Sequence, residues 1–186
     1  MSLSVKERGC HIATFRAVQV YFMEMLASWV PTTAEMEVKL LMGEHIWDCA
    51  QHADTLGKRT HELRLPLQHS MAPSAPYDAI LKGVRAATAT PERVAGFYRC
   101  LLPGMSARYR HYLSLTDELM DAPSVRIIER VLADHARMLK QCSAMLRERP
   151  ELERVDPAWL QSQVQAEAAL PAILAAENDA SDTSPR

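Results

Sequence analysis

The chain has 186 residues, of which 48% are hydrophobic and 24% are charged, and its formal net charge at pH 7 is −2. This balance is ordinary for one globular domain, and the lack of a basic footprint argues against nucleic-acid binding. No apolar run approaches the roughly 20 residues that cross a bilayer, and the N-terminus lacks the regions of a secretory signal. We therefore expect a cytoplasmic protein without a membrane or nucleic-acid partner.

The low content of glycine and aromatic residues favours helix. The first helix is predicted over residues 5–30, with apolar side chains at helical spacing on its inner face. Pro31 ends this helix, and Thr32-Thr-Ala-Glu35 is a capping-box pattern that starts the second one. The second helix is predicted to run to about Leu65, because Pro66 follows.

The middle of the chain predicts a long connection followed by a third long helix. Residues 66–76 contain three prolines and read as a loop, and residues 77–87 read as a short helix. Thr90-Pro91-Glu92 is a helix start, with Thr90 as N-cap and proline at the first helical position. The third helix is predicted to reach about Met120. Pro103-Gly104 should kink this helix without ending it, because the apolar pattern continues in phase.

The last third of the chain predicts two more helices. Asp121-Ala-Pro-Ser124 starts a fourth long helix to about Arg147, and Asp156-Pro157 starts a final one to about Leu170. Four long helices, with a long connection between the second and the third, indicate an all-α four-helix bundle with a crossover. The predicted organisation is a bundle at 1–150, a C-terminal helix at 151–177 packed on it, and a disordered tail at 178–186.

The second helix carries polar groups on its apolar stripe. His45, Asp48, His52 and Arg59 share that stripe, and His135 replaces an aliphatic residue on the fourth helix. Burying such groups without partners costs several kcal/mol, so they must be paired, metal-bound or functional. We predict that His45, Asp48 and His52 are buried, face the fourth helix, and form one site with His135.

Two types of site are consistent with these residues. Imidazoles and carboxylates that face inward from different helices build dinuclear iron or manganese sites in bundles. The alternative is a buried hydrogen-bonded network without metal, in which Arg59 is a counter-ion to Asp48 or Glu62. The cysteines form no CxxC pair and sit within helical patterns, so we expect buried, reduced thiols at Cys10, Cys49, Cys100 and Cys142.

Two stretches resemble the ferritin-like superfamily. They are Gly43-Glu-His-Ile-Trp-Asp-Cys-Ala-Gln-His-Ala-Asp54, with Glu62-Leu-Arg64 downstream, and Asp121-Ala-Pro-Ser-Val-Arg-Ile-Ile-Glu-Arg-Val-Leu-Ala-Asp-His135. With the helix plan, the resemblance covers about residues 5–148 and is to small bacterial ferritin-like proteins of mostly unassigned role. It implies a ferritin-like four-helix bundle with iron or manganese at its centre. The chain departs from that family's pattern because it contains no Glu-x-x-His.

The resemblance implies a non-haem dimetal oxidase or hydroxylase of a small metabolite. The expected metal ligands are Glu44, His45, Asp48, His52, Glu129 and His135. Arg59 is expected to bind substrate or to pair with a carboxylate, and Tyr98 and Tyr109 to support the site or to pack in the core. The alternatives are a metal-free ferritin-like bundle that acts as a binding or interaction protein, and a haem bundle through His52 and His135. A homodimer is the expected assembly.

Overall fold

The computed structural model describes residues 3–170 and 172–175. These residues form helices and one isolated β-bridge, between Pro73 and Leu174. The all-α prediction is confirmed, whereas the predicted tail at 178–186 lies outside the described residues. Within the described residues, no helix is long and apolar enough to span a membrane.

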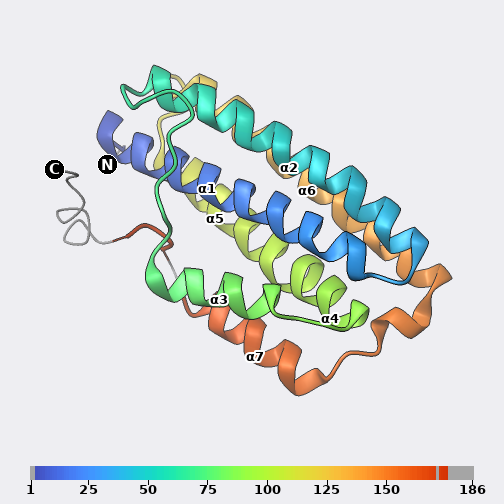
Figure 1. Ribbon diagram of the computed structural model, residues 1–186. Helices are drawn as coiled ribbons and strands as arrows, with labels where there is room; N and C mark the ends of the chain where they lie inside the picture. The colour runs from blue at the N-terminus through green and yellow to red at the C-terminus, as the bar shows by residue number, and fades with distance from the viewer. Residues whose placement is uncertain (1–2, 171, 176–186) are drawn as a thin grey trace, which may run out of the picture.

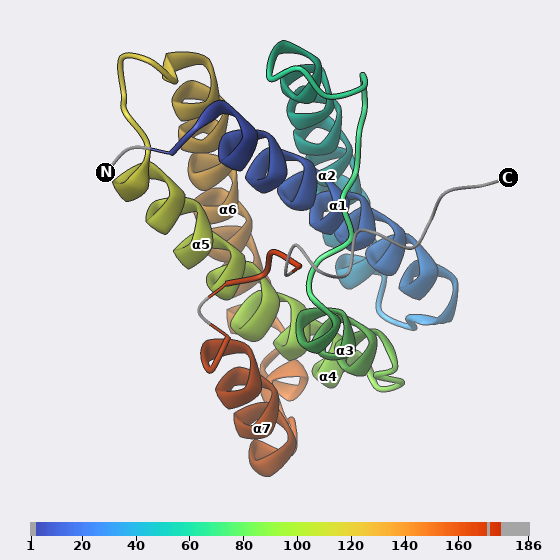
Figure 2. The same ribbon diagram turned by 90° about the vertical axis from the view of Figure 1, so that its left-hand side faces the viewer.

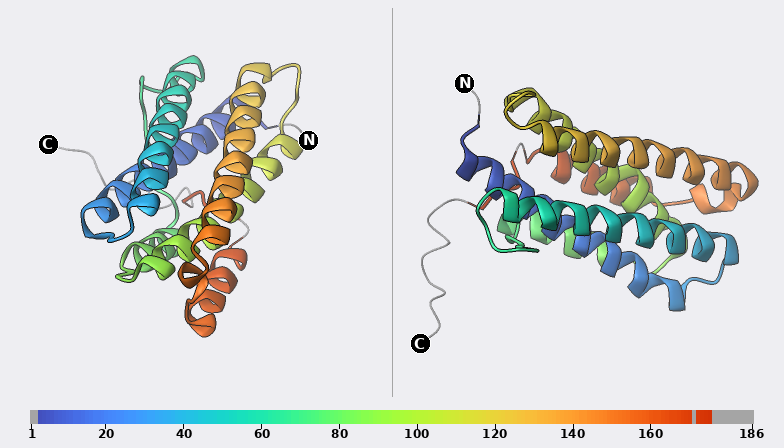
Figure 3. Two further views of the ribbon diagram at one scale, coloured as in Figure 1. Left: turned by 90° about the vertical axis from the view of Figure 1, so that its right-hand side faces the viewer. Right: turned by 90° about the horizontal axis from the view of Figure 1, so that it is seen from above.

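Four helical rods make up the body of the protein (Figure 1). The first two are α1 (Val5–Trp29) and α2 (Met36–Glu62), which form an antiparallel pair. The third rod consists of α4 (Thr90–Ala95), the π-helical segment η2 (Gly96–Leu101) and α5 (Leu102–Leu115). The fourth rod is α6 (Ala122–Glu148), which lies beside α2 (Figure 3).

Contacts at the two ends fix the directions of the rods. At one end Arg59, near the end of α2, bonds Asp121, which directly precedes α6. At the other end Arg149, which follows α6, pairs with Glu37 at the start of α2. Thus α2 and α6 are antiparallel, and α2 runs in the same direction as the third rod. A long connection, residues 63–89, joins these two rods.

Two shorter helices cover one side of the rods (Figure 2). The crossover contains α3 (Ala75–Arg85), and the chain after α6 passes through a 3-10 turn, η3 (Pro150–Glu153), into α7 (Pro157–Ala168). The Arg108 guanidinium of α5 pairs with the Glu167 carboxylate of α7 and donates to the Leu170 carbonyl. A side chain at Gly104 would collide with that carboxylate, so Gly104 allows α7 to dock on the third rod.

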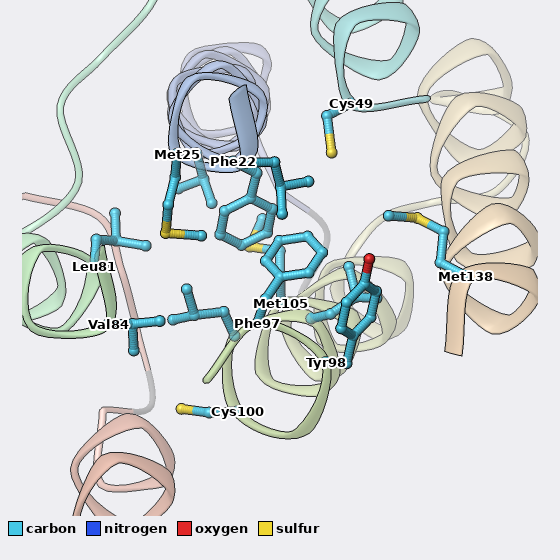
Figure 4. Close-up of a cluster of buried hydrophobic side chains, with 14 of the residues drawn as sticks. Phe22, Met25, Cys49, Leu81, Val84, Phe97, Tyr98, Cys100, Met105 and Met138 are labelled. Atoms are coloured by element: carbon cyan, nitrogen blue, oxygen red, sulfur yellow. The ribbon is translucent and has the colours of Figure 1, made fainter. Parts of the chain in front are cut away.

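The apolar core lies between the four rods and α3. Phe22 and Met25 of α1 lie near Leu81 and Val84 of α3, and Phe97 of η2 lies beside Phe22 (Figure 4). The rings of Phe22 and Phe97 meet edge to face, with their centroids 5.3 Å apart. Cys49 of α2 and Met138 of α6 also belong to this core, and polar residues join these two helices beside it.

As predicted, the third helix continues past Pro103. A proline inside a helix lacks the N–H donor and clashes with the carbonyl four residues earlier. Here the wider π-helical turn at Gly96–Leu101 directly precedes Pro103, which lies in the first turn of α5. The irregular hydrogen bonding that proline requires is therefore confined to η2, and the rod continues to Leu115.

Two of the predicted helix starts are wrong in detail. The pattern at residues 32–35 forms no capping box, because the Thr33 hydroxyl donates to the Trp29 carbonyl and the N-cap residue of α2, Glu35, makes no side-chain cap. Thr90 is the first residue of α4 rather than its N-cap, and its hydroxyl donates to the Glu35 carboxylate at 2.7 Å. These side chains join the two helix starts to each other instead of capping them.

Candidate functional site

Polar side chains join α2 to α6 at three levels, about two helical turns apart at the extremes. The His45 ring bonds Gln141 at 3.0 Å, the Asp48 carboxylate pairs with Arg137 at 2.8 Å, and the His52 ring bonds Asp134 at 3.0 Å. We call these six residues the polar seam. His45 and His52 are 0% and 4% exposed, and Asp48 is half-buried. The prediction that the α2 residues face this helix is confirmed.

The His45 ring is held by hydrogen bonds at both nitrogens. Its Nδ1 lies 2.6 Å from the Tyr98 hydroxyl, and its Nε2 lies 3.0 Å from Gln141 Oε1. Since an amide oxygen only accepts, Nε2–H donates to Gln141, and Nδ1 accepts from Tyr98. Burial lowers the pKa of His45 and raises that of Tyr98, so the ring stays neutral and the phenol keeps its proton.

Arg137 lies among the carboxylates of the seam. Its guanidinium is 2.8 Å from Glu44, 2.8 Å from Asp48 and 3.3 Å from Asp134. Asp134 also accepts from His52, and these two partners outweigh burial and lower its pKa. Asp134 is therefore ionised at neutral pH, and the Arg137 guanidinium lies between the three carboxyl groups.

His135 forms an inner cluster behind the seam. The Ser106 hydroxyl donates to the Leu102 carbonyl, so it accepts from His135 Nδ1–H at 2.8 Å. His135 Nε2 accepts from the Gln19 amide at 3.3 Å, and the same amide nitrogen lies 2.9 Å from the Tyr109 hydroxyl. Burial, followed by the neighbouring His52, lowers the pKa of His135 to about 3.

The inner cluster and the seam are in contact. The ring centroids of His52 and His135 are 5.8 Å apart, which confirms that the predicted histidines of the two helices come together. Tyr109 also lies against His135, with a centroid separation of 5.6 Å. Sequence periodicity therefore identified a group of side chains that the fold does bring together.

Three buried acceptors around this contact have no hydrogen-bond partner within the described residues. They are Gln19 Oε1, Asp48 Oδ2 and His52 Nδ1. The His52 nitrogen is an acceptor because Nε2–H donates to Asp134, which leaves a lone pair on Nδ1 of the neutral ring. Since unpaired buried polar atoms are costly, a hydrogen-bond donor is the occupant that suits these positions.

A cleft of about 490 Å³ opens over the seam, between α2 and α6. Arg126 and Arg130 line its α6 wall and have no carboxylate partner in the described part of the chain. The indole of Trp47 lies at its edge and is 65% exposed. The wall residues are Trp47, Asp48, Gln51, His52 and Thr55 from α2, and Arg126, Ile127, Arg130, Val131, Asp134 and Arg137 from α6.

Two predicted site residues lie apart from this cluster. Glu129 is exposed and does not line the cleft, because it is one helical step (about 100°) away from Arg130 on α6. Arg59 bonds Glu62, Ser124 and Asp121 near the end of α2, so it pairs with Glu62 but not with Asp48. Neither residue is therefore positioned to bind metal or substrate at the seam.

The central residues that sequence reasoning missed are Arg137 and Gln141. Arg137 follows Arg130 by seven residues, and Gln141 follows Asp134 by seven residues. This spacing is two helical turns in each case. That repeated spacing was the available signal. Arginine and glutamine are common at half-exposed helix positions, so this spacing alone does not identify them as site residues. It does so only when α6 is known to pack antiparallel to α2.

The donor set does not fit two divalent ions. Both nitrogens of His45 and of His135 bond protein side chains, and Glu129 lies apart. The Arg137 guanidinium would repel a cation bound among Glu44 and its neighbouring carboxylates. The same occupied nitrogens of His135 leave no ligand atom for haem iron. These side chains form a hydrogen-bonded network in which three buried acceptors have no partner within the described residues, and they do not form a set of metal ligands.

Comparisons with protein-family models, with curated proteins and with solved structures found no match to this chain.

Proposed function

We propose that this protein binds a small anionic molecule in the cleft between α2 and α6. The observation that carries the proposal is the pair of guanidiniums, Arg126 and Arg130, that line the cleft and have no carboxylate partner among residues 3–170 and 172–175. Guanidinium groups bind carboxylates and phosphates through paired, charge-assisted hydrogen bonds. This function corresponds to a metal-free bundle that acts as a binding protein.

The remaining walls of the cleft support a small organic ligand. Ile127 and Val131 offer apolar contact beside the arginines, and the Trp47 ring is available for stacking. A concave site with apolar walls and a few convergent polar groups is typical of small-molecule binding. The buried His52 ring, fixed by Asp134, provides a rigid floor.

Arg130→Gln is expected to weaken anion binding about tenfold or more, because a hydrogen bond to a charged group contributes about 1.5–3 kcal/mol. Isothermal titration with inorganic phosphate and a panel of small carboxylates measures the change. Arg147→Gln is the matched control, since Arg147 is exposed on the same helix and outside the cleft. Equal affinities of the two variants, or no anion binding by the unaltered protein, would contradict the proposal.

The metal-dependent oxidase implied by the ferritin-like resemblance is a second candidate. One observation favours it, because Glu44, His45 and Asp48 each offer a ligand atom and these atoms lie within 4.8 Å of one another. An ion at this position has to displace Arg137 from two carboxylates and Gln141 from the His45 ring. That requirement places the oxidase second.

Metal analysis separates the two candidates. Protein purified without chelator is expected to contain no stoichiometric iron or manganese, because Arg137 already neutralises the carboxylates. Arg137→Ala is expected to bind added Mn²⁺ at least tenfold more tightly than Arg147→Ala, since only the first change removes the resident cation. Two iron or manganese ions per unaltered chain would instead support the oxidase.

The ferritin-like arrangement of the helices, the homodimer and the cytoplasmic location are further proposals. The direction of the four rods and the crossover that contains α3 support a ferritin-like arrangement. Exposed Met36 and Leu40, on the same face of α2 as Trp47, support a homodimer. A cytoplasmic location remains a proposal from composition.

A further inference from the structure

The two arginines of the cleft form a pair on its α6 wall. Arg126 and Arg130 are one helical turn apart, so their side chains project from the same face of that helix. Within the described part of the chain, neither guanidinium has a carboxylate partner. Burial lowers the pKa of the His52 ring, and the Arg130 charge adds to that effect, so Arg130 lies near the interior of the cleft. Two positive charges are therefore adjacent at one end of this wall.

The other end of the α6 wall has a different charge pattern. The Arg137 guanidinium pairs with Asp48 at 2.8 Å and with Asp134 at 3.3 Å, and both carboxyl groups line the cleft. Although burial opposes it, the hydrogen bonds from His52 and Arg137 lower the pKa of Asp134, so this carboxyl is ionised. A second anion placed here would meet the Asp134 carboxylate, and a cation would meet Arg137. A ligand that suits the cleft therefore carries its charge at the arginine pair alone.

A phosphate monoester has the charge that this arrangement favours. Its single phosphoryl group carries about −1.5 to −2 charges at pH 7 and offers three oxygen acceptors. A carboxylate carries one charge and two oxygens, which a single guanidinium already satisfies through a bidentate pair. The adjacent guanidiniums of Arg126 and Arg130 therefore match one phosphoryl group better than one carboxylate. Two separate carboxylates would bring a second negative charge toward Asp134.

We propose that the ligand of the cleft is a phosphate monoester with an uncharged, apolar organic group. The phosphoryl group binds between Arg126 and Arg130, and the organic group lies against the half-buried Ile127 of the same wall. The cleft volume of about 490 Å³ is in the range of small-molecule sites, so we assign a free small molecule rather than a phosphorylated protein. This inference rests on the proposed anion-binding function and adds the acidic group of the ligand, its charge and the character of its organic group.

Four matched probes test the inference by isothermal titration at pH 7.5. Phenyl phosphate carries the proposed groups, phenyl sulfate has a similar shape with one charge fewer, 4-carboxyphenyl phosphate adds a second anion, and inorganic phosphate lacks the ring. Phenyl phosphate is expected to bind at least tenfold more tightly than phenyl sulfate, because a monoanion leaves one guanidinium charge unmatched. It is also expected to bind at least threefold more tightly than the other two probes. The carboxyphenyl probe brings a carboxylate toward Asp134, and inorganic phosphate makes no apolar contact.

Two variants test the role of the arginine pair. Arg126→Gln and Arg130→Gln are each expected to weaken phenyl phosphate binding at least tenfold. Each is also expected to reduce the preference for phenyl phosphate over phenyl sulfate to about twofold, since one guanidinium then remains for either anion. Arg147→Gln, at an exposed position of α6 outside the cleft, is the control and should bind both probes as the unaltered protein does. Circular dichroism checks that each variant remains helical.

The outcomes distinguish this inference from the proposed function. If phenyl phosphate and phenyl sulfate bind equally, while Arg130→Gln weakens both, the phosphate assignment is wrong and anion binding stands. Binding of a phosphotyrosine peptide at least tenfold more tightly than phenyl phosphate would overturn the assignment to a free small molecule. If the unaltered protein binds none of the anionic probes, including simple carboxylates, both proposals are wrong.

Discussion

Asp121→Ala is expected to lower the free energy of unfolding by about 3–5 kcal/mol, because it leaves the Arg59 charge buried without its partner. Asp121 is 0% exposed, and its Oδ1 accepts from the Arg59 guanidinium at 2.8 Å. Its Oδ2 accepts from the Tyr112 hydroxyl at 2.5 Å and from the Thr116 hydroxyl at 2.9 Å. Burial raises the pKa of the Asp121 carboxyl, but its hydrogen bonds lower the pKa by a larger amount. The net pKa is therefore lowered, and the group is held as a carboxylate.

Thermal and urea unfolding measure this effect, and a loss of this size corresponds to a fall in Tm of about 10 °C for a chain of this length. Glu62→Ala is the matched control, since Glu62 pairs with the same Arg59 at 2.7 Å but is 58% exposed. An exposed ion pair contributes about 0–1 kcal/mol. Equal losses from the two substitutions would contradict a central role for the buried pair.

Acid is expected to destabilise the protein through His135 well above the pH at which carboxyl groups become protonated. The pKa of this ring falls from 6.5 to about 3 in the fold, so between these values the unfolded chain binds more protons than the folded one. The contribution of the neutral ring is complete above pH 6.5 and is lost as pH falls toward 3. At about 1.4 kcal/mol for each unit, the change from pH 7.5 to pH 5 costs on the order of 2 kcal/mol.

Urea unfolding at pH 7.5 and at pH 5 tests this dependence. His135→Gln is expected to reduce the loss between the two pH values by on the order of 2 kcal/mol, because glutamine does not titrate. His45 and His52 have pKa values lowered in the same direction and account for part of the loss that remains. His61→Gln, a change at an exposed histidine, serves as control. An unchanged pH dependence in His135→Gln would show that the buried ring is not the group responsible.

Helix positions could be predicted because local chemistry determines them. Pro31 follows the end of α1 at Trp29 within two residues, and the Asp156 side chain accepts from the Ala158 N–H at the start of α7. The capping box at residues 32–35 could not be judged locally. Thr90, more than 50 residues away in the chain, takes the Glu35 carboxylate that the cap would use. A tertiary contact thus overrides a local sequence signal.

The candidate site could be predicted as far as one helix at a time. Periodicity placed His45 and His52 on one face of α2, and their burial follows from that face. The partner of each ring depends on the register between α2 and α6, which a single helix pattern does not contain. The sequence alone therefore does not identify Arg137 as the cation of the polar seam. It also does not show that Glu129 is exposed outside the cleft while the adjacent Arg130 lines it.

The π-helical turn at Gly96–Leu101 makes the third rod tolerant of a change in length at this one place. A π turn contains about one residue more than an α turn, so it absorbs one extra residue while the helix faces before and after it stay in phase. Removing one residue from this turn should therefore leave a regular helix in which Ser106 still faces the His135 ring. Removing one residue from the regular helix α5 before Ser106 should instead rotate Ser106 by about 100° away from that ring. Chains related to this one should therefore vary in length within this turn before they vary within α5.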